Sequence, residues 1–219
     1  MRILFATENR GKLREAEQIL ADTGLEVLPL SAAGVRSDPE ENGETFEDNA
    51  LIKVRAARAA LVTAGGTAPE SGDPADGDII LADDSGLMID AFDGGPGVHS
   101  ARWMGHDTSY DVKNAKVLEL LAGKTGAERA ARYVCAIAAS LPDGREFVTA
   151  APMEGVIAET PAGTGGFGYD PIFLVEEYGK TAAELTPDEK NAVSHRGKAL
   201  RQMRAILGEA LGGADRKGI

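Results

Sequence analysis

Residues 2–20 read RILFATENRGKLREAEQIL, and this stretch decides the fold class. Its first five residues are mainly apolar and predict a short buried strand, which leads into the polar turn 7–12. Leu13, Ala16 and Leu20 then recur at helical spacing and predict a helix. A strand that feeds a helix through a polar turn is typical of α/β proteins.

Strands and helices continue to mix along the rest of the chain. Apolar runs predict further strands over residues 27–30, 79–82, 87–89, 132–140, 146–151, 156–159 and 172–175. Capping residues and helical spacing predict helices over residues 46–62, 108–121 and 187–207, the last of them restarted near residue 194. We therefore expect the α/β class with a mixed β-sheet.

Two segments fall outside this pattern. Residues 63–78 are rich in glycine, proline and acidic side chains and contain no Val, Ile, Leu or aromatic residue, so they have nothing to bury. We expect them to form an exposed, flexible insertion within a single domain. Residues 212–219 are expected to form a disordered tail.

The composition excludes several classes of protein. The 219 residues suffice for one large domain or two small lobes, and 23 basic against 35 acidic residues give a net charge of −12. This acidity disfavours nucleic acids and anionic membranes as partners. The chain shows no secretion signal and no apolar stretch of the roughly 18 residues that a membrane span needs, so we expect a cytoplasmic protein. The single cysteine, Cys135, excludes an intrachain disulfide and a cysteine-based zinc site.

The turn after the first strand could bind an anion. Free backbone N–H groups at the start of a helix attract negative charge, and a lysine adds a point charge. An ordinary capped turn with a solvated lysine is the alternative interpretation. The residues of this turn are Thr7, Glu8, Asn9, Arg10, Gly11 and Lys12.

Carboxylates gather in two further segments. Residues 83–86, DDSG, follow the predicted strand 79–82, and neighbouring residues of a strand point to opposite faces. A divalent cation commonly relieves the repulsion between such carboxylates, and the Ser-Gly pair permits a sharp turn. The acidic loop 40–43, EENG, could supply another ligand. Solvated carboxylates are the alternative in both segments.

Three other features could contact a ligand. Lys53 shares a helix face with apolar residues, so its ammonium group either reaches solvent or points at an anion. The loop 163–170, GTGGFGYD, presents Phe167 between glycines, where the ring could stack on a purine or pack into the core. The segment 194–198, SHRGK, places Arg196 on an apolar helix stripe. A buried arginine there needs an anionic partner, supplied either by a ligand or by a structural ion pair.

Taken together, these segments resemble the inosine triphosphate pyrophosphatase family, which hydrolyses deaminated purine nucleoside triphosphates. The resemblance covers most of the chain. Six motifs carry it in order: TENRGK, ETFEDNALIK, ADDSGL, GGPGVHSARW, GTGGFGYDPIF and SHRGKAL. It implies a long curved mixed sheet flanked by helices, with two lobes and an active-site cleft between them, assembled as a homodimer.

The resemblance also implies a reaction and a set of residue roles. A purine nucleoside triphosphate such as ITP, dITP or XTP and water would give the monophosphate and pyrophosphate, with Mg²⁺ held by Glu40 and Asp84. Asp84 would also act as the general base, and Ser85 would contact the substrate. Residues 7–12 would form the phosphate loop, with positive charge from Lys12, Lys53, Lys190 and Arg196. The base-binding positions carry over onto Phe167, Gly168, Tyr169, Asp170, Lys190, His195 and Arg196.

Two departures from the family pattern stand out. Glu8 replaces a small residue in the phosphate loop and puts a carboxylate near the triphosphate. The insertion at residues 63–78 is longer than the family pattern leads us to expect. Two other functions remain open: a related pyrophosphatase for pyrimidine or methylated nucleotides, and a nucleotide-binding regulator without catalysis.

Overall fold

The computed structural model describes residues 1–65, 77–105 and 107–212. Its strands are β1 (Arg2–Phe5), β2 (Glu26–Pro29), β3 (Ile79–Ile89), β4 (Ala130–Ser140), β5 (Glu146–Ile157), β6 (Phe173–Val175) and β7 (Lys180–Thr181). Its α-helices are α1 (Arg10–Leu20), α2 (Phe46–Thr63), α3 (Tyr110–Leu120), α4 (Pro187–Val193) and α5 (His195–Gly212). Short 3₁₀ turns include η4 (Gly97–His99), η5 (Gly126–Arg129) and η6 (Asp170–Ile172).

The strands form a mixed sheet. Within the described residues its seven strands follow the order β2-β1-β3-β4-β5-β6-β7. β1 pairs in parallel with β2 and β3, whereas β6 pairs antiparallel with β5 and β7. The predicted α/β class with a mixed sheet flanked by helices is therefore confirmed.

The chain divides into two compact units, each assembled from separate stretches. The first unit comprises Met1–Asp84, Cys135–Ala151 and Arg196–Ile219. The second comprises Ser85–Val134 and Pro152–His195. Strands β3, β4 and β5 therefore each contribute residues to both units.

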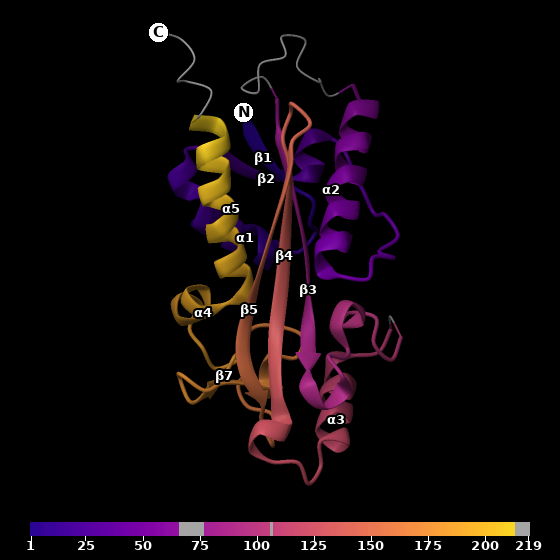
Figure 1. Ribbon diagram of the computed structural model, residues 1–219, viewed down its shortest axis with the longest axis vertical. Helices are drawn as coiled ribbons and strands as arrows, with labels where there is room; N and C mark the ends of the chain where they lie inside the picture. The colour runs from indigo at the N-terminus through magenta and orange to yellow at the C-terminus, as the bar shows by residue number, and fades with distance from the viewer. Residues whose placement is uncertain (66–76, 106, 213–219) are drawn as a thin grey trace. The chain divides into compact units, whose positions relative to one another are not determined.

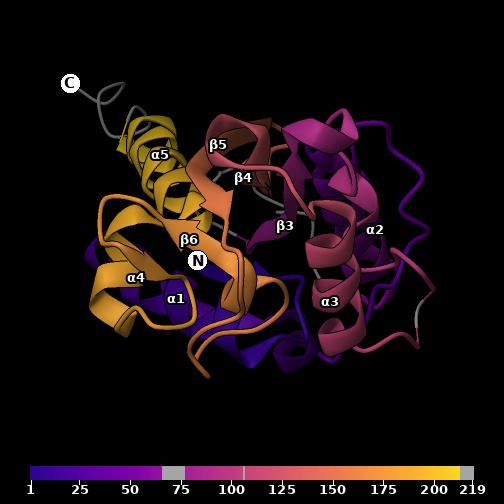
Figure 2. The same cartoon turned by 90° about the horizontal axis from the view of Figure 1, so that it is seen from below.

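The first unit has helices on both faces of its strands. Helices α1 and α5 lie side by side on one face and α2 covers the other, as Figures 1 and 2 show from two directions. Ile3, Ile79 and Leu81 pack with residues of α1 and α5 in one apolar cluster. Because side chains alternate along a strand, Leu4 and Ile80 point to the opposite face, and both are fully buried.

The second unit has its own apolar core. Val117 and Leu121 from α3 and the turn after it pack with Leu87 of β3 and Tyr133 of β4. The ring of Tyr133 also packs against Phe173, with 4.6 Å between ring centroids. This core supports the loop that follows residue 162.

The predicted break in the strand after Ala82 is wrong, because β3 continues from Ile79 to Ile89. A Ser-Gly pair favours a turn in isolation, but β3 lies between β1 and β4 in the sheet. The place of β3 inside the sheet overrides the local preference of residues 85 and 86. The two aspartates at 83 and 84 therefore lie within a strand and obey its alternation.

Local helix signals agree with the structure. The Thr45 side chain caps α2, and Thr186 caps α4 in a reciprocal box with Glu189. The predicted restart near residue 194 is confirmed, since α4 ends at Val193 and α5 begins at His195.

The two predicted flexible segments fall mainly on residues outside the described part, namely 66–76 and 213–219. Thr63 is the last residue of α2, and Gly212 is the last of α5. Among the described helices, none has the length and apolar character required to span a lipid bilayer.

Candidate active site

Asp83 and Asp84 stand at the end of the part of β3 that belongs to the first unit. Strand alternation sends the Asp83 carboxylate to the face covered by α1 and α5, and the Asp84 carboxylate to the face covered by α2. Both residues are buried. Two chemically different sites are therefore built from adjacent residues.

The Asp83 carboxylate is held by two cations. Its Oδ2 lies 2.9 Å from Lys12 Nζ and 3.4 Å from Arg196 Nε, and Arg196 also donates to Glu15 Oε2 at 2.6 Å. Burial alone would raise the pKa of Asp83, but the charges of Lys12 and Arg196 lower it to about 2. Burial opposes the charge on Arg196 as well, yet Asp83 and Glu15 raise its pKa. Asp83 is thus ionised at neutral pH and anchors two basic residues.

The Asp84 carboxylate has fewer charged partners. Asn49 Nδ2 donates to Oδ2 at 3.1 Å, and Lys53 Nζ donates to Oδ1 at 3.2 Å. Burial raises the pKa of Asp84, and Lys53 and Asn49 offset only part of that effect. Each oxygen accepts one of these bonds and keeps a second lone pair. Asp84 therefore combines fixed orientation with capacity for a proton or a cation.

Lys53 links Asp84 to an acidic loop. Its ammonium group lies 2.8 Å from Glu41 Oε1 and also donates to the backbone oxygen of Asp83 at 3.0 Å. Burial would lower the pKa of Lys53, but Asp84 and Glu41 raise it above its ordinary value. The lysine remains charged and points at anions, which is one of the two roles expected from the sequence.

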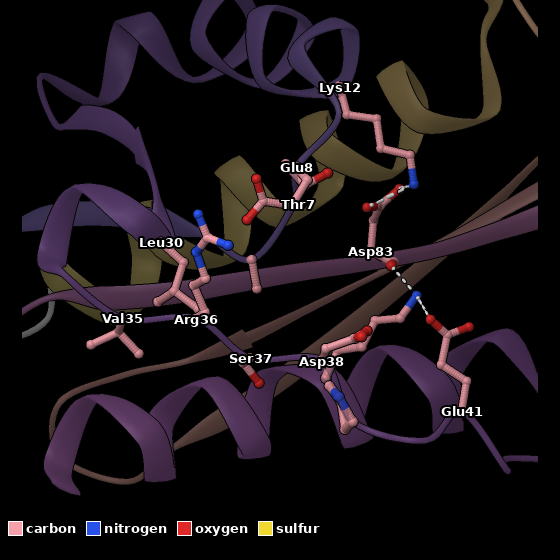
Figure 3. Close-up of a pocket in the computed structure, with 13 residues that line it drawn as sticks. Thr7, Glu8, Lys12, Leu30, Val35, Arg36, Ser37, Asp38, Glu41 and Asp83 are labelled. Carbon is pink, nitrogen blue, oxygen red and sulfur yellow. Dashed lines mark hydrogen bonds and ion pairs between the residues drawn. The ribbon is translucent and has the colours of Figure 1, made fainter. Parts of the chain in front are cut away.

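A pocket of about 190 Å³ opens beside these groups in the first unit (Figure 3). The turn after β1 contributes Thr7, Glu8 and Lys12, and β3 contributes Asp83. The opposite wall comes from residues 35–39 with Glu41 and Lys53. Cations and carboxylates thus line one polar cavity.

The predicted phosphate loop is only partly arranged as expected. Asn9 Oδ1 accepts the N–H groups of Gly11 at 2.8 Å and Lys12 at 3.2 Å, so the expectation that these groups are free is wrong. The backbone N–H of Asn9 in turn donates to Thr7 Oγ1 at 3.2 Å. Arg10 is the first residue of α1. An asparagine cap satisfies the start of the helix locally, which leaves side chains to supply the charge of the pocket.

Glu8, which departs from the family pattern of the phosphate loop, lines the pocket. The side chains of Glu8 and Arg36 both point into the cavity in Figure 3. Arg36 comes from the loop before α2 and played no part in the sequence prediction. The pocket therefore contains an additional carboxylate and an additional guanidinium.

The two neighbouring glutamates of the acidic loop have different positions. Glu40, the predicted metal ligand, is exposed, whereas Glu41 is half-buried, lines the pocket and pairs with Lys53. Within the described residues no three His, Cys, Asp or Glu side chains come close enough together to hold a metal ion. A Mg²⁺ site that uses one or two carboxylates together with substrate phosphates needs no such cluster. The Glu40 assignment stays a prediction.

The glycine-rich loop 163–170 belongs to the second unit and is held by Asp170. The buried Asp170 Oδ2 accepts the Phe167 N–H at 2.8 Å and Lys190 Nζ at 2.6 Å. Gly166 is required here, because it has φ +70° and a Cβ atom would collide with Asp170 Oδ2. These contacts leave the Phe167 side chain 49% exposed, with Lys190 Nζ 5.4 Å from its ring centroid.

The remaining predicted base-binding residues are mostly buried. Tyr169 donates its hydroxyl to the Ser100 backbone oxygen at 3.0 Å, and its ring is 2% exposed. The His195 ring stacks on Tyr133 with 4.9 Å between centroids. Ser85 is half-buried in β3 and belongs to the second unit. Among these residues, Phe167 is the one that displays an aromatic face to solvent.

Sequence reasoning missed several partners of the predicted residues. Asn49 lies one helical turn before Lys53, and Glu15 lies three residues after Lys12, so helical spacing was the available signal. Glu41 adjoins a predicted ligand in a loop without periodicity. Asp83 was recognised as acidic, but only the fold shows which cations it meets.

Comparison with known proteins identifies the family of this chain. Residues 3–206 match the model of the Ham1 family. A dITP/XTP pyrophosphatase of Exiguobacterium sibiricum is 42% identical over 97% of this chain and 100% of that protein. A dITP/XTP pyrophosphatase of Geobacter sulfurreducens is 46% identical over 94% of this chain and 96% of that protein.

A solved structure leads to the same family. The HAM1 protein from Coxiella burnetii is 40% identical, covers 95% of this chain and 99% of its own, and superposes with a TM-score of 0.78. This chain belongs to the Ham1 family.

Proposed function

We propose that this protein is a nucleoside triphosphate pyrophosphohydrolase that converts deaminated purine nucleoside triphosphates to the monophosphate and pyrophosphate. The relatives named dITP/XTP pyrophosphatase align with it over nearly its whole length. The observation that carries the proposal is the asymmetric aspartate pair of β3. One carboxylate anchors two cations, and the other is oriented by Asn49 and Lys53 beside the polar pocket.

Asp84 is the proposed general base. The reaction breaks the bond between the α- and β-phosphates with water as nucleophile, so a group must accept the proton of that water. Asn49 and Lys53 fix the Asp84 carboxylate, and each oxygen retains a lone pair. Burial raises its pKa, which makes it a better proton acceptor than Asp83.

The pocket residues would neutralise the triphosphate. Lys12 and Lys53 both line the pocket and would bring two ammonium groups to the phosphates. Mg²⁺, when bound, would supply further charge neutralisation and polarise a phosphate oxygen. Asp84 and a glutamate of the 40–41 pair would hold the ion, and Glu41 has the more favourable position because it lines the pocket.

The base would be recognised by the loop around Phe167 together with Lys190, His195 and Arg196. The exposed ring of Phe167 would stack on the purine, with Lys190 beside it. Hypoxanthine and xanthine have a 6-oxo acceptor where adenine has an amino donor. A site that donates to this oxygen leaves its buried donors unpaired against adenine. The proposed donors are His195, Arg196 and the backbone N–H groups of Gly168 and Tyr169, because the Phe167 N–H already donates to Asp170.

The experiment is a pyrophosphate-release assay on the full chain with ITP, XTP, GTP and ATP, with and without Mg²⁺. We expect Mg²⁺-dependent release from ITP and XTP and little from ATP and GTP. Asp84→Asn should abolish turnover, whereas Asp143→Asn, on a hairpin turn paired with Arg145, should leave it unchanged. If the protein releases pyrophosphate from none of these nucleotides, the proposal is overturned, and a nucleotide-binding protein without catalysis is favoured.

We also propose, on the family resemblance, that the protein is a cytoplasmic homodimer. Light scattering coupled to gel filtration would test the dimer, with a mass near 22.9 kDa for the monomer. A monomeric mass at micromolar concentration would contradict it.

A further inference from the structure

Helix α3 and the turn around η4 support the glycine-rich loop from within the second unit. Asn114 Nδ2 donates to the Gly168 backbone oxygen at 3.2 Å. The ring of Tyr110, four residues earlier on α3, meets the Tyr169 ring edge-on, with 5.2 Å between centroids and an 87° interplanar angle. The Tyr169 hydroxyl reaches the Ser100 backbone oxygen. Consecutive loop residues are therefore held by separate elements.

The support is itself cross-linked. Lys113 Nζ donates to the Ala101 backbone oxygen at 2.7 Å and lies 4.8 Å from the Tyr110 ring centroid. Ser100 Oγ accepts the Leu87 N–H at 2.8 Å and donates to the Gly97 backbone oxygen at 2.6 Å. These bonds fasten α3 to the turn, and the turn to β3. The motif GGPGVHSARW, which had no role in the predicted site, is thus part of this support.

Asn114 makes a polar contact between α3 and the loop backbone. It is 5% exposed, and its Oδ1 atom is buried and accepts no hydrogen bond within the described part of the chain. The Gly168 carbonyl requires a donor, so the amide nitrogen must face the loop. A buried unpaired acceptor destabilises a fold. Core stability alone therefore does not account for an asparagine here.

The backbone of Gly168 needs a constraint from outside the loop, because glycine has no side chain to restrict its φ and ψ angles. Gly168 has φ +71°. Its peptide groups connect Phe167 to Tyr169, so their orientation determines where the Phe167 ring and the adjacent N–H groups point. The hydrogen bond from Asn114 fixes one of these peptide groups.

We propose that Asn114 is a positioning residue for base recognition. It holds the Gly168 peptide so that the Phe167 ring and the neighbouring N–H groups face the purine in one arrangement. Loss of this bond lets the loop sample other arrangements and weakens discrimination between 6-oxo and 6-amino purines. The inference rests on the proposed function, because it assigns a cause to the selectivity of that same site.

The test compares Asn114→Ala and Asn114→Asp with Val117→Ala, a matched control. Val117 is fully buried one turn further along α3 and packs in the apolar core of the unit. Asn114→Asp keeps the shape but replaces the donor by an acceptor. We expect kcat/KM for ITP relative to ATP to fall about tenfold in both Asn114 variants, as for one lost hydrogen bond that positions a donor. Val117→Ala should lower Tm and leave this ratio unchanged.

Hydrogen exchange of the loop gives a readout that needs no activity. The N–H groups of Gly165, Phe167 and Asp170 donate hydrogen bonds in the wild type and should exchange slowly. Asn114→Ala should accelerate exchange in a peptide covering residues 163–173, and Val117→Ala should do so much less.

The outcomes separate the two proposals. If the wild type releases pyrophosphate from ITP but the Asn114 variants keep the ITP to ATP ratio and lose only Tm, the inference is overturned and the proposed function stands. If the wild type releases none, the proposed function falls. In that case unchanged exchange of the loop in Asn114→Ala would refute the positioning role as well.

Discussion

Asp83 and Asp84 are neighbours in β3, yet Asp83 meets Lys12 and Arg196 on one face and Asp84 meets Asn49 and Lys53 on the other. The number of cations differs between the two faces, and so does the direction of the pKa shift. Because successive side chains of a strand point to opposite faces, two adjacent aspartates can have different roles: Asp83 anchors cations, and Asp84 is the proposed reactive carboxylate.

This asymmetry predicts opposite phenotypes for two conservative substitutions. Asp83→Asn removes one of the two carboxylates that pair with the buried Arg196, and breaking a buried ion pair lowers the free energy of unfolding by up to about 3–5 kcal/mol, less where Glu15 still compensates the charge. Asp84→Asn removes a charge that burial disfavours, so stability should be unchanged or slightly increased while turnover is lost. Urea unfolding of both variants, with activity measured in parallel, checks the pair. Equal destabilisation by the two substitutions would contradict the assigned roles.

Neighbouring glutamates offer a second paired comparison. Glu41 lines the pocket and pairs with Lys53, whereas Glu40 is exposed. Glu41→Gln should therefore raise the Mg²⁺ concentration needed for half-maximal activity by about 10–100-fold, the usual effect of disturbing the surroundings of a bound metal. Titration of Mg²⁺ at saturating ITP measures this concentration. A larger effect of Glu40→Gln would support the ligand predicted from the family resemblance.

Features set by a residue and its immediate neighbours were predictable from the sequence. The side chains of Thr45 and Thr186 accept hydrogen bonds from backbone N–H groups three residues later, so the sequence spacing alone predicts these caps. The Ser85-Gly86 pair misled the strand prediction because sheet pairing overrode a local turn preference. Local signals hold where no long-range contact competes with them.

The partners within the site required the fold. Asp170 was predicted as a base contact, and its observed partners are Lys190 and the backbone of Phe167. The sequence marks Asp170 as acidic and near a glycine loop, but it cannot show that the loop closes on that carboxylate. Arg196 was correctly expected to need an anion, and only the fold identifies Asp83 and Glu15.

The single cysteine predicts a simple chemical test of folding. Cys135 is fully buried in β4, and burial raises the pKa of its thiol to about 12. Because the thiolate is the reactive form, the native protein should react with Ellman's reagent far more slowly than a free thiol. The rate should rise to that of a free thiol in denaturing urea. Rapid stoichiometric reaction of the native protein at neutral pH would show that β4 opens readily.

Glu8 predicts a gain rather than a loss of substrate affinity. Its carboxylate points into the pocket that contains Lys12, where a triphosphate would add several negative charges. Two like charges about 4 Å apart in water repel by about 1 kcal/mol, which corresponds to about fivefold in affinity. Glu8→Gly should therefore lower KM for ITP by about fivefold with little change in kcat, measured from initial rates at low ionic strength. Glu26→Gln removes the same charge from an exposed position on β2 and serves as the control. If Glu8→Gly instead raises KM, Glu8 contributes to binding, and its partner would be sought in Arg36 on the opposite wall.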